Sequence, residues 1–424
     1  MGLDMGKKRS LYIILAVSLL VNCVFLFAGC SGWWMLPSNR QAQNSENTTA
    51  NNSNGQSSSQ SDGTANASKY SKEIEEKLKK IDKVINAYYL NDTEIDEEKM
   101  LESMYTGYVN GLGEKYSTYY SAEEYADLME SSSGEYSGIG VSVSQNMNTG
   151  IITVVNPFEN GPGYEAGIRK EDILYEVEGE EVTGEDINQV VARIKGEEGT
   201  TVNLTVYRPA TGEYLDMTVE RRIVQNPTVT YEMKADGIGY IHITEFDEVT
   251  VEQFNTAISE LKNQGAKGLI FDVRDNPGGL LTSVCSMLDQ LLPEGLLVYT
   301  MDKNGNREEQ TSDAEHVLEM PMIVLTNGNS ASAAEIFTAA LQDYKWATVM
   351  GTTTFGKGIV QVILPLDDGS AVKVTQSKYY TPNGVCIHGT GVTPDIEVEY
   401  DREAEGDNQL DAAMQQMEKM LTAE

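Results

Sequence analysis

The last third of the chain holds a serine in a setting that suits nucleophilic chemistry. Ser332 follows a short apolar run, residues 322–326, and a turn of small residues, at the predicted start of a helix. The positive end of a helix dipole favours negative charge developing on a hydroxyl that loses its proton. Ser332 and Glu335 also have the spacing of a capping box, which is a purely structural pattern. Ser332 is therefore a candidate nucleophile, with a helix cap as the alternative.

A lysine between two glycines is the candidate base for this serine. Lys357 stands between Gly356 and Gly358, just before a strand-like run. At an exposed hairpin tip it would be an ordinary surface residue. In a poorly hydrated pocket, burial would disfavour the ammonium form and lower the pKa, so that the amine could accept a serine proton. The sequence leaves both interpretations open.

The few histidines and cysteines argue against other chemistry. The three histidines have no metal-ligand spacing, and the four cysteines form no C-x-x-C pair, so we expect no metal and no cofactor. Without a well-placed histidine, a Ser–Lys dyad is the economical serine mechanism. The formal net charge of -34 argues against nucleic acid as a partner.

A third segment supplies the pattern of an oxyanion site. Residues 268–274 read as a buried strand, 275–279 as a tight turn with two glycines, and 280 onward as a helix. Such a turn leaves backbone N–H groups bare at a helix start, where they could bind an oxyanion. An ordinary strand-to-helix turn is the alternative.

Taken together, the three segments resemble the carboxyl-terminal processing (tail-specific) proteases, which are serine peptidases with a PDZ domain. The resemblance spans roughly residues 70 to 420 and rests on DGIGYIHITEF at 236–246, RDNPGG at 274–279, FGKGIVQ at 355–361 and GVTPDIEV at 391–398. It implies that Ser332 is the nucleophile, Lys357 the base and Gln361 the third member. It further implies oxyanion donors at the backbone N–H of Ala333 and of Gly278 or Gly279.

The position of Gln361 relative to Lys357 needs a local bend. On one extended strand the two residues would share a face but lie ~13 Å apart. A direct contact therefore predicts bending at Gly358, or a helical turn.

Short strands with glycine and proline punctuation occupy residues 133–209, with a helix at 186–196. Within them Gly138, Ile139, Gly140 and Val141 resemble the carboxylate-binding loop of a PDZ domain, and the stretch from Ala166 to Gly179 resembles the part that follows it. Backbone N–H groups of such a loop hold a terminal carboxylate while the peptide adds as a strand. A plain hairpin is the alternative.

The N-terminal region predicts a tether. Residues 11–28 carry no charge and follow Lys7, Lys8 and Arg9, which favours an uncleaved membrane span with the body outside the cytoplasm. Residues 27–30 also resemble a lipobox, so a lipidated Cys30 is the alternative. The polar stretch 37–68 reads as a flexible linker.

Three helices are expected next, at about 70–90, at 97–112 and within 114–131. Ile74, Leu78, Ile81 and Ile85 form an apolar stripe on the first, which favours packing or a homodimer. Ser121 and Glu124 predict a capping box for the third.

We therefore predict a multidomain α+β protein whose peptidase core is a mixed sheet of the crotonase/ClpP type, split by the PDZ insertion. The expected divisions are anchor or signal 1–30, linker 31–68, helical segment 69–131, PDZ domain 132–222, peptidase domain 223–400 and C-terminal helix 401–424. The expected function is a serine endopeptidase at the outer face of the cell membrane, with polypeptides recognised by their free C-termini. A catalytically inactive PDZ scaffold and an intracellular processive protease are the alternatives.

Overall fold

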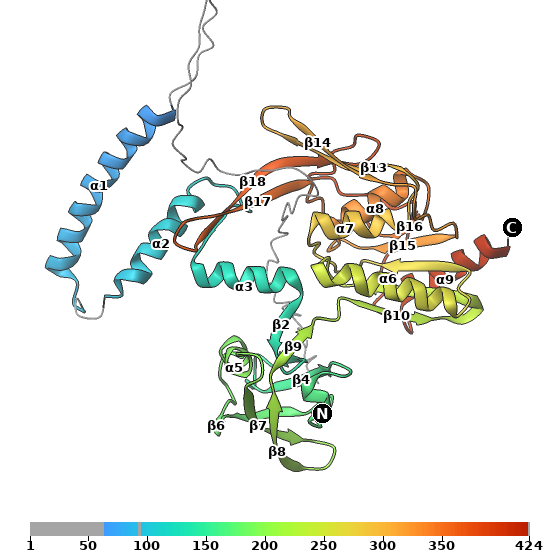
Figure 1. The fold of residues 1–424 in the computed structure, drawn as a ribbon, viewed down its shortest axis with the longest axis horizontal. Coiled ribbons are helices and arrows are strands. Elements are labelled where there is room, and N and C mark those ends of the chain that lie inside the picture. The colour runs from blue at the N-terminus through green and yellow to red at the C-terminus, as the bar shows by residue number, and fades with distance from the viewer. Residues whose placement is uncertain (1–62, 92–94, 423–424) are drawn as a thin grey trace, which may run out of the picture. The chain divides into compact units, whose positions relative to one another are not determined.

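The computed structural model describes residues 63–91 and 95–422 (Figure 1). The predicted membrane anchor, Cys30 and most of the predicted linker lie outside these ranges. None of the helices within the two ranges combines the length and the apolar character that crossing a bilayer requires. The described residues divide after Tyr108 into two compact units.

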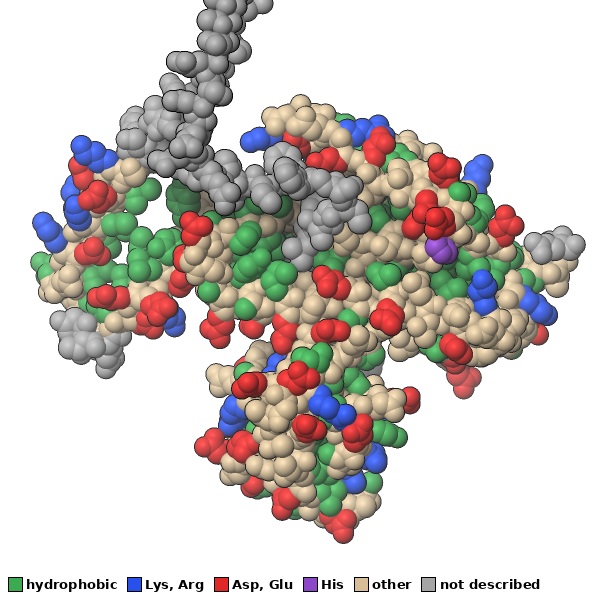
Figure 2. Space-filling model, viewed as in Figure 1, with side chains coloured by type: hydrophobic (Ala, Val, Ile, Leu, Met, Phe, Trp, Pro, Cys, Tyr) green, Lys and Arg blue, Asp and Glu red, His purple; other side chains and the backbone are tan. Residues whose placement is uncertain are grey.

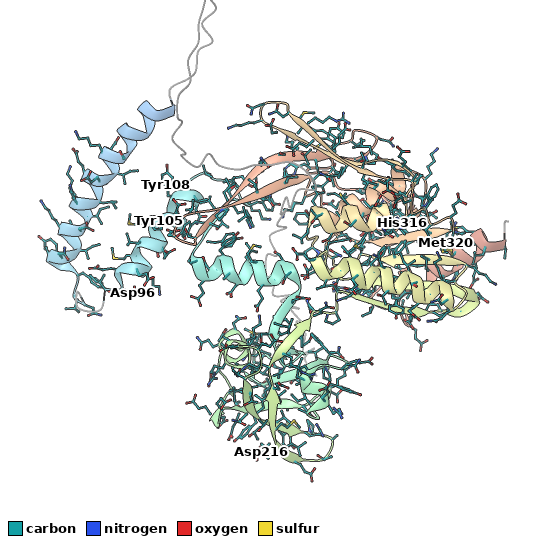
Figure 3. All side chains as sticks on the ribbon, in the orientation of Figure 1. Asp96, Tyr105, Tyr108, Asp216, His316 and Met320 are labelled. Atoms are coloured by element: carbon teal, nitrogen blue, oxygen red, sulfur yellow. The ribbon has the colours of Figure 1, made fainter. Side chains whose placement is uncertain are left out.

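The first unit is helical. It holds α1, Gly63–Tyr88, and most of α2, Glu97–Asn110. Helix α1 begins inside the range predicted as linker. The prediction placed its start too late, because the first turns are polar and carry no apolar period. Ile74 and Ile81 of the predicted stripe are 42% and 43% exposed. Tyr105 and Tyr108 of α2, labelled in Figure 3, are also exposed.

The second unit is organised around a sheet of six strands, here called the parallel sheet. Its order is β10-β11-β12-β15-β16-β19, and only β10 runs antiparallel to its neighbour. The strands are β10 Val229–Met233, β11 Ile238–Ile243, β12 Gly268–Asp272, β15 Met322–Thr326, β16 Thr348–Gly351 and β19 Ile396–Glu397, and a 3-10 turn, Ala235–Gly237, joins the first two.

Helices cover the two faces of this sheet, so its central strands are apolar throughout. Helices α6 Glu248–Asn263, α7 Leu281–Asp289 and α8 Ala333–Asp343 contribute to one core, and α9 Asn408–Thr422 contributes to the other (Figure 1). Side chains alternate between these cores: Phe271 and Val324 belong to the first, and Ile270 and Ile323 to the second. Burial on both faces explains why β12 and β15 read as continuous apolar runs.

Parallel strands end at one edge of their sheet, and the turns that follow them meet there. The segments after β11, β12, β15 and β16 therefore come together. They contain Phe246, the turn 274–279, Ser332 and Lys357, respectively.

An antiparallel sheet completes the larger unit. Its order is β1-β18-β13-β14, with β17 also pairing with β18. The strands are β1 Thr118–Tyr120, β13 Gly295–Asp302, β14 Arg307–Ser312, β17 Ile359–Pro365 and β18 Ala371–Tyr380. Strand β1 lies in the range predicted as a helical segment, yet it pairs with Ala371–Lys373 of β18. A segment far upstream of residue 223 thus belongs to the peptidase sheet.

Helix α3, Ala122–Ser133, follows β1 and begins as predicted. The Ser121 side chain accepts a hydrogen bond from the Glu124 N–H at 3.2 Å, and the Glu124 carboxylate accepts one from the Ser121 N–H at 2.9 Å. The capping-box prediction is confirmed at this position.

Beyond α3 the chain forms a small sheet with the order β3-β4-β5-β7-β8, and β6 pairs with β5. Its elements are β3 Val141–Gln145, β4 Ile152–Pro157, α4 Pro162–Glu165, β5 Ile173–Val177, β6 Glu180–Glu181, α5 Ile187–Ile194, β7 Thr201–Arg208 and β8 Glu213–Glu220. A two-stranded ribbon, β2 Glu135–Gly138 with β9 Arg222–Gln225, carries the chain in and out. Strand β8 was not predicted, because it is largely exposed and has only a weak apolar alternation.

Candidate active site

Ser332 lies at the N-terminus of α8 in a strained backbone conformation. Its φ of 55° and ψ of -113° fall outside the regions that ordinary residues adopt. Strain of this kind persists only where the surroundings fix it, and it is concentrated at functional sites. The Ser332 side chain is fully buried, and its Oγ has no hydrogen-bond partner among the described residues. Ser332 and Glu335 thus have the arrangement of a capping box, but the hydroxyl makes no hydrogen bond to the helix start.

Glu335 explains why the capping pattern is present without a serine cap. Its Oε2 accepts hydrogen bonds from two backbone N–H groups, that of Ser332 at 2.9 Å and that of Lys357 at 2.8 Å. Its Oε1 accepts from the Thr354 hydroxyl at 2.5 Å and from the Gly356 N–H at 2.7 Å. Burial raises the pKa of Glu335, and these hydrogen bonds offset part of that rise. One buried carboxyl group thus joins the candidate nucleophile and the candidate base.

The glycines beside Lys357 are required by close packing against a later loop. A Cβ on Gly358 would lie 2.5 Å from the His388 backbone nitrogen, and one on Gly356 would lie 3.0 Å from that of Gly391. The Gly389 N–H donates to the Gly356 carbonyl at 2.8 Å. This loop keeps residues 356–358 out of regular strand geometry, and β17 begins only at Ile359.

The Lys357 side chain is buried rather than exposed at a hairpin tip, with 5% of its surface accessible. Its Nζ lies 4.8 Å from the centroid of the Tyr116 ring, at a distance typical of a cation–π contact. Because Ser332 Oγ has no partner, no hydrogen bond joins it to Lys357 Nζ in this structure. The two residues are brought together through their backbones, while their reactive atoms remain unbonded.

The Gln361 side chain contacts the next strand through its amide nitrogen. It pairs with Thr375 of β18 at a register shift, where β17 and β18 step out of regular alignment. Its Nε2 donates to Thr375 Oγ1 at 3.3 Å, whereas its buried Oε1 has no partner within the described residues. Strand β17 begins at Ile359, directly after Gly358, and no Lys357–Gln361 hydrogen bond is formed.

The predicted oxyanion donors differ in availability. The Gly278 N–H already donates to the Asn276 side chain at 2.8 Å. The N–H groups of Gly279 and Ala333 have no acceptor among the described residues. Gly279 has a φ of 142°, and a Cβ there would lie 2.4 Å from the Phe246 carbonyl oxygen. Only glycine fits this approach of the turn to the end of β11.

Side chains lock the oxyanion turn to the segment that carries Ser332. Asp275 accepts hydrogen bonds from the amides of Asn327 and Asn329, at 3.0 and 2.7 Å. The Asn276 carbonyl accepts the Ala331 N–H at 2.9 Å, and the Ser330 hydroxyl donates to the Val273 carbonyl at 2.7 Å. These hydrogen bonds fix the turn 274–279 to the segment that leads into Ser332.

Comparisons with known proteins fit this geometry. The model of peptidase family S41 matches residues 237–398, and a PDZ-domain model matches residues 152–208. A carboxy-terminal-processing protease of Bartonella bacilliformis is 37% identical over 72% of this chain and 70% of its own length. Carboxy-terminal processing protease CtpA of Bacillus subtilis is 37% identical over 76% of this chain and 69% of its own length.

This chain belongs to peptidase family S41. Its relatives are carboxy-terminal processing serine proteases, and it is an enzyme of that class. A solved structure of a putative S41 protease from Bacteroides fragilis has the same fold, with a TM-score of 0.50 and 18% identity over 80% of this chain and 97% of that one. The architecture is a mixed α/β multidomain protein with a PDZ domain and an S41 peptidase core.

The four residues predicted to bind a carboxylate precede the part of the chain that the PDZ-domain model matches, and they join β2 to β3. Gly138 ends β2, Gly140 has a φ of 66°, and Val141 begins β3. The carbonyl of Ile139 accepts the Gly163 N–H at 2.7 Å. Strand β3 lies at one end of the small sheet's strand order, so one of its edges is not paired within that sheet. An added peptide strand could pair there.

Several residues of the S41 site escaped sequence reasoning. Glu335 was visible only as half of a capping pattern. Glu114, Tyr116 and Thr375 lie on other segments and carry no local signal. An acidic pair, half-buried Glu245 and buried Asp247, flanks Phe246, which pairs with Gly279 of the turn 274–279. Burial, followed by the charge of Glu245, raises the pKa of Asp247 to about 8.

Proposed function

We propose that this S41 peptidase is a serine endopeptidase in which Ser332 attacks the peptide carbonyl and Lys357 removes its proton. The observation that carries the proposal is the Glu335 carboxylate, which accepts the backbone N–H of both residues through one oxygen. The strained backbone of Ser332 and its unpartnered hydroxyl support the nucleophilic role. The burial of the Lys357 side chain, with its Nζ over the Tyr116 ring, supports the basic role.

The reaction begins when Lys357 Nζ swings from the Tyr116 ring to the Ser332 hydroxyl. The amine takes the proton, and Oγ attacks the carbonyl carbon to give a tetrahedral oxyanion. Free N–H groups of Gly279 and Ala333 stabilise that charge. The resulting lysine ammonium gives its proton to the leaving amine, and water then hydrolyses the acyl-enzyme. Gln361 Oε1 accepts an N–H of Lys357 and so directs the amine's lone pair toward Ser332.

The PDZ domain selects substrates by their free C-terminus in this proposal. Its unpaired β3 edge supports strand addition, and the Gly138–Val141 loop supports carboxylate binding. Peptide capture is also proposed to favour the rearrangement that joins Lys357 to Ser332, since the dyad is not hydrogen bonded in the resting structure.

The remaining proposals concern the setting of the enzyme. We place its catalytic part outside the cytoplasm, tethered by residues 1–30. We keep the predicted domain divisions as working boundaries except at α1, which begins at Gly63, and at β1, which pairs with the peptidase strand β18. We also propose a homodimer, supported by exposed apolar side chains on α1 and α2, which Figure 2 colours green. Sedimentation equilibrium of the purified chain tests the dimer, and accessibility to added protease on intact cells tests the location.

The central test measures cleavage of an unfolded protein by Ser332→Ala and Lys357→Ala variants. Both should lose activity by several orders of magnitude, because each removes a member of the reacting pair. Lys378→Ala is the matched control, since Lys378 is an exposed lysine on the neighbouring strand β18. Cleavage near the wild-type rate by either active-site variant would refute the mechanism. Substrates with a free or an amidated C-terminus, compared in the same assay, test tail recognition.

A further inference from the structure

A carboxylate from the segment before β1 is connected to Gln361 through a short chain of hydrogen bonds. Glu114 Oε2 accepts from the Thr375 hydroxyl at 2.9 Å and from the Ser117 hydroxyl at 2.7 Å. Thr375 Oγ1 in turn accepts from Gln361 Nε2 at 3.3 Å. The Thr375 N–H donates to Ser117 Oγ at 3.2 Å, which closes the network.

The charge of Glu114 fixes the direction of every bond in this chain. An ionised carboxylate only accepts, so the Thr375 hydroxyl must donate to it. The lone pairs of that hydroxyl then remain for a donor, and the Gln361 NH2 group is the donor that faces it. Burial alone would raise the pKa of Glu114, but the hydrogen bonds from Ser117, Tyr116 and Thr375 outweigh it and hold the pKa below its ordinary value. Glu114 is therefore ionised at neutral pH.

The amide of Gln361 is thereby held with its oxygen turned away from Thr375. That oxygen is buried and has no partner among the described residues, which is costly for a polar group. A vacant acceptor of this kind suits the proposed mechanism, in which the Lys357 amine donates an N–H to Gln361 Oε1 while the lone pair of the amine nitrogen points toward Ser332.

We propose that Glu114 is a positioning residue of the active site, which acts through Thr375 to hold the Gln361 carbonyl ready for Lys357. The proposal rests on the Ser–Lys–Gln function proposed above. The same carboxylate accepts the Tyr116 N–H at 2.9 Å, so it also orders the turn whose ring contacts Lys357 Nζ.

Thr375 offers a matched pair of variants. Thr375→Val keeps the side-chain shape and removes the hydroxyl, whereas Thr375→Ser keeps the hydroxyl. We expect Thr375→Val to lower kcat about 3- to 10-fold, the value of one hydrogen bond, with KM nearly unchanged. Thr375→Ser should keep kcat within about twofold of wild type. Glu114→Gln should lower kcat as much as Thr375→Val does, because a neutral amide can donate as well as accept and no longer forces the Thr375 hydroxyl to donate to it. Equal losses in Thr375→Ser and Thr375→Val would overturn the proposal.

A double-mutant cycle separates positioning from simple structural support. If Glu114 acts through Gln361, then Glu114→Gln should have little further effect on kcat in a Gln361→Ala background. Independent, additive losses would contradict the inference, as would a Gln361→Ala enzyme with wild-type activity.

A readout without turnover covers the case in which Gln361→Ala is too slow to measure. In full-length Ser332→Ala protein labelled at glutamine side-chain nitrogen, the Gln361 NH2 signal, assigned by its loss in Gln361→Ala, should exchange slowly with water. Thr375→Val and Glu114→Gln should each speed that exchange, and unchanged exchange in both would reject the network. Failure of the Ser–Lys mechanism itself would appear separately, as cleavage by Ser332→Ala.

Discussion

Glu335 provides the most direct test of how the site is held together. Replacing it with alanine would remove the acceptor of three backbone N–H groups, those of Ser332, Gly356 and Lys357. Each buried donor left without a partner costs about 1–3 kcal/mol. The total of about 3–9 kcal/mol is comparable to the whole stability of an ordinary domain, about 5–15 kcal/mol. We therefore expect Glu335→Ala to fold poorly.

Glu335→Gln is the informative variant, because it can keep an acceptor for two of the three backbone N–H groups. The glutamine oxygen can take the place of Oε2 and keep the bonds from Ser332 and Lys357. Its NH2 can donate to the Thr354 hydroxyl, which then has to turn its own proton to another acceptor, and the Gly356 N–H is left unsatisfied. The expected loss in free energy of unfolding is about 1–3 kcal/mol.

Urea unfolding of the full-length chain measures this difference. Trp346 packs against the core that contains α8, so its fluorescence reports on the peptidase domain once Trp33 and Trp34 are replaced by phenylalanine. Glu418→Gln is the matched control, because it makes the same chemical change at an exposed glutamate of α9. An unfolding midpoint for Glu335→Gln equal to that of Glu418→Gln would refute the reasoning, as would equal losses in Glu335→Gln and Glu335→Ala.

Three further outcomes follow from single contacts. Burial raises the pKa of Asp247 to about 8, so the stability that its protonated form contributes is fully present below about pH 4 and is lost as pH rises through about 8. The wild-type free energy of unfolding should therefore fall across this range. Asp247→Asn should flatten the fall, as measured by urea titrations at several pH values. Gly279→Ala places a Cβ 2.4 Å from a backbone oxygen at a φ of 142°, so the variant should lose activity and have a lower melting temperature by calorimetry. Gly305→Ala is the control, and it should lower the melting temperature far less because no atom lies near the added Cβ. Arg274→Met leaves the buried Asp272 without its ion pair and should destabilise the fold by about 3–5 kcal/mol in urea unfolding.

Local pattern was sufficient to predict elements whose signals lie within a few residues. The apolar run 322–326 is β15 as expected, since both of its faces are buried. Ser121 and Glu124 form the predicted capping box. The same pattern at Ser332 misleads when read alone, because the hydroxyl is left free and only Glu335 takes part. What separates the two cases is burial and a contact from Lys357, neither of which is written in the local sequence.

Other features depend on contacts between distant segments and were beyond local reasoning. Strand β1 has three residues and is defined by its pairing with β18. Glu114 becomes part of the site only because that pairing brings it to Thr375. The orientation of Gln361 follows from a register shift between β17 and β18, which no periodicity reveals.

The ribbon of β2 and β9 has a consequence for how this enzyme could be rebuilt. The PDZ domain is entered and left through two adjacent strands that pair from Glu135–Gln225 to Gly138–Arg222. Ends that lie side by side permit one module to be exchanged for another without redesign of the host. A chimaera carrying a foreign tail-binding module at this ribbon would inherit new substrate preference, while the buried Glu335 carboxylate that joins Ser332 and Lys357 would remain untouched.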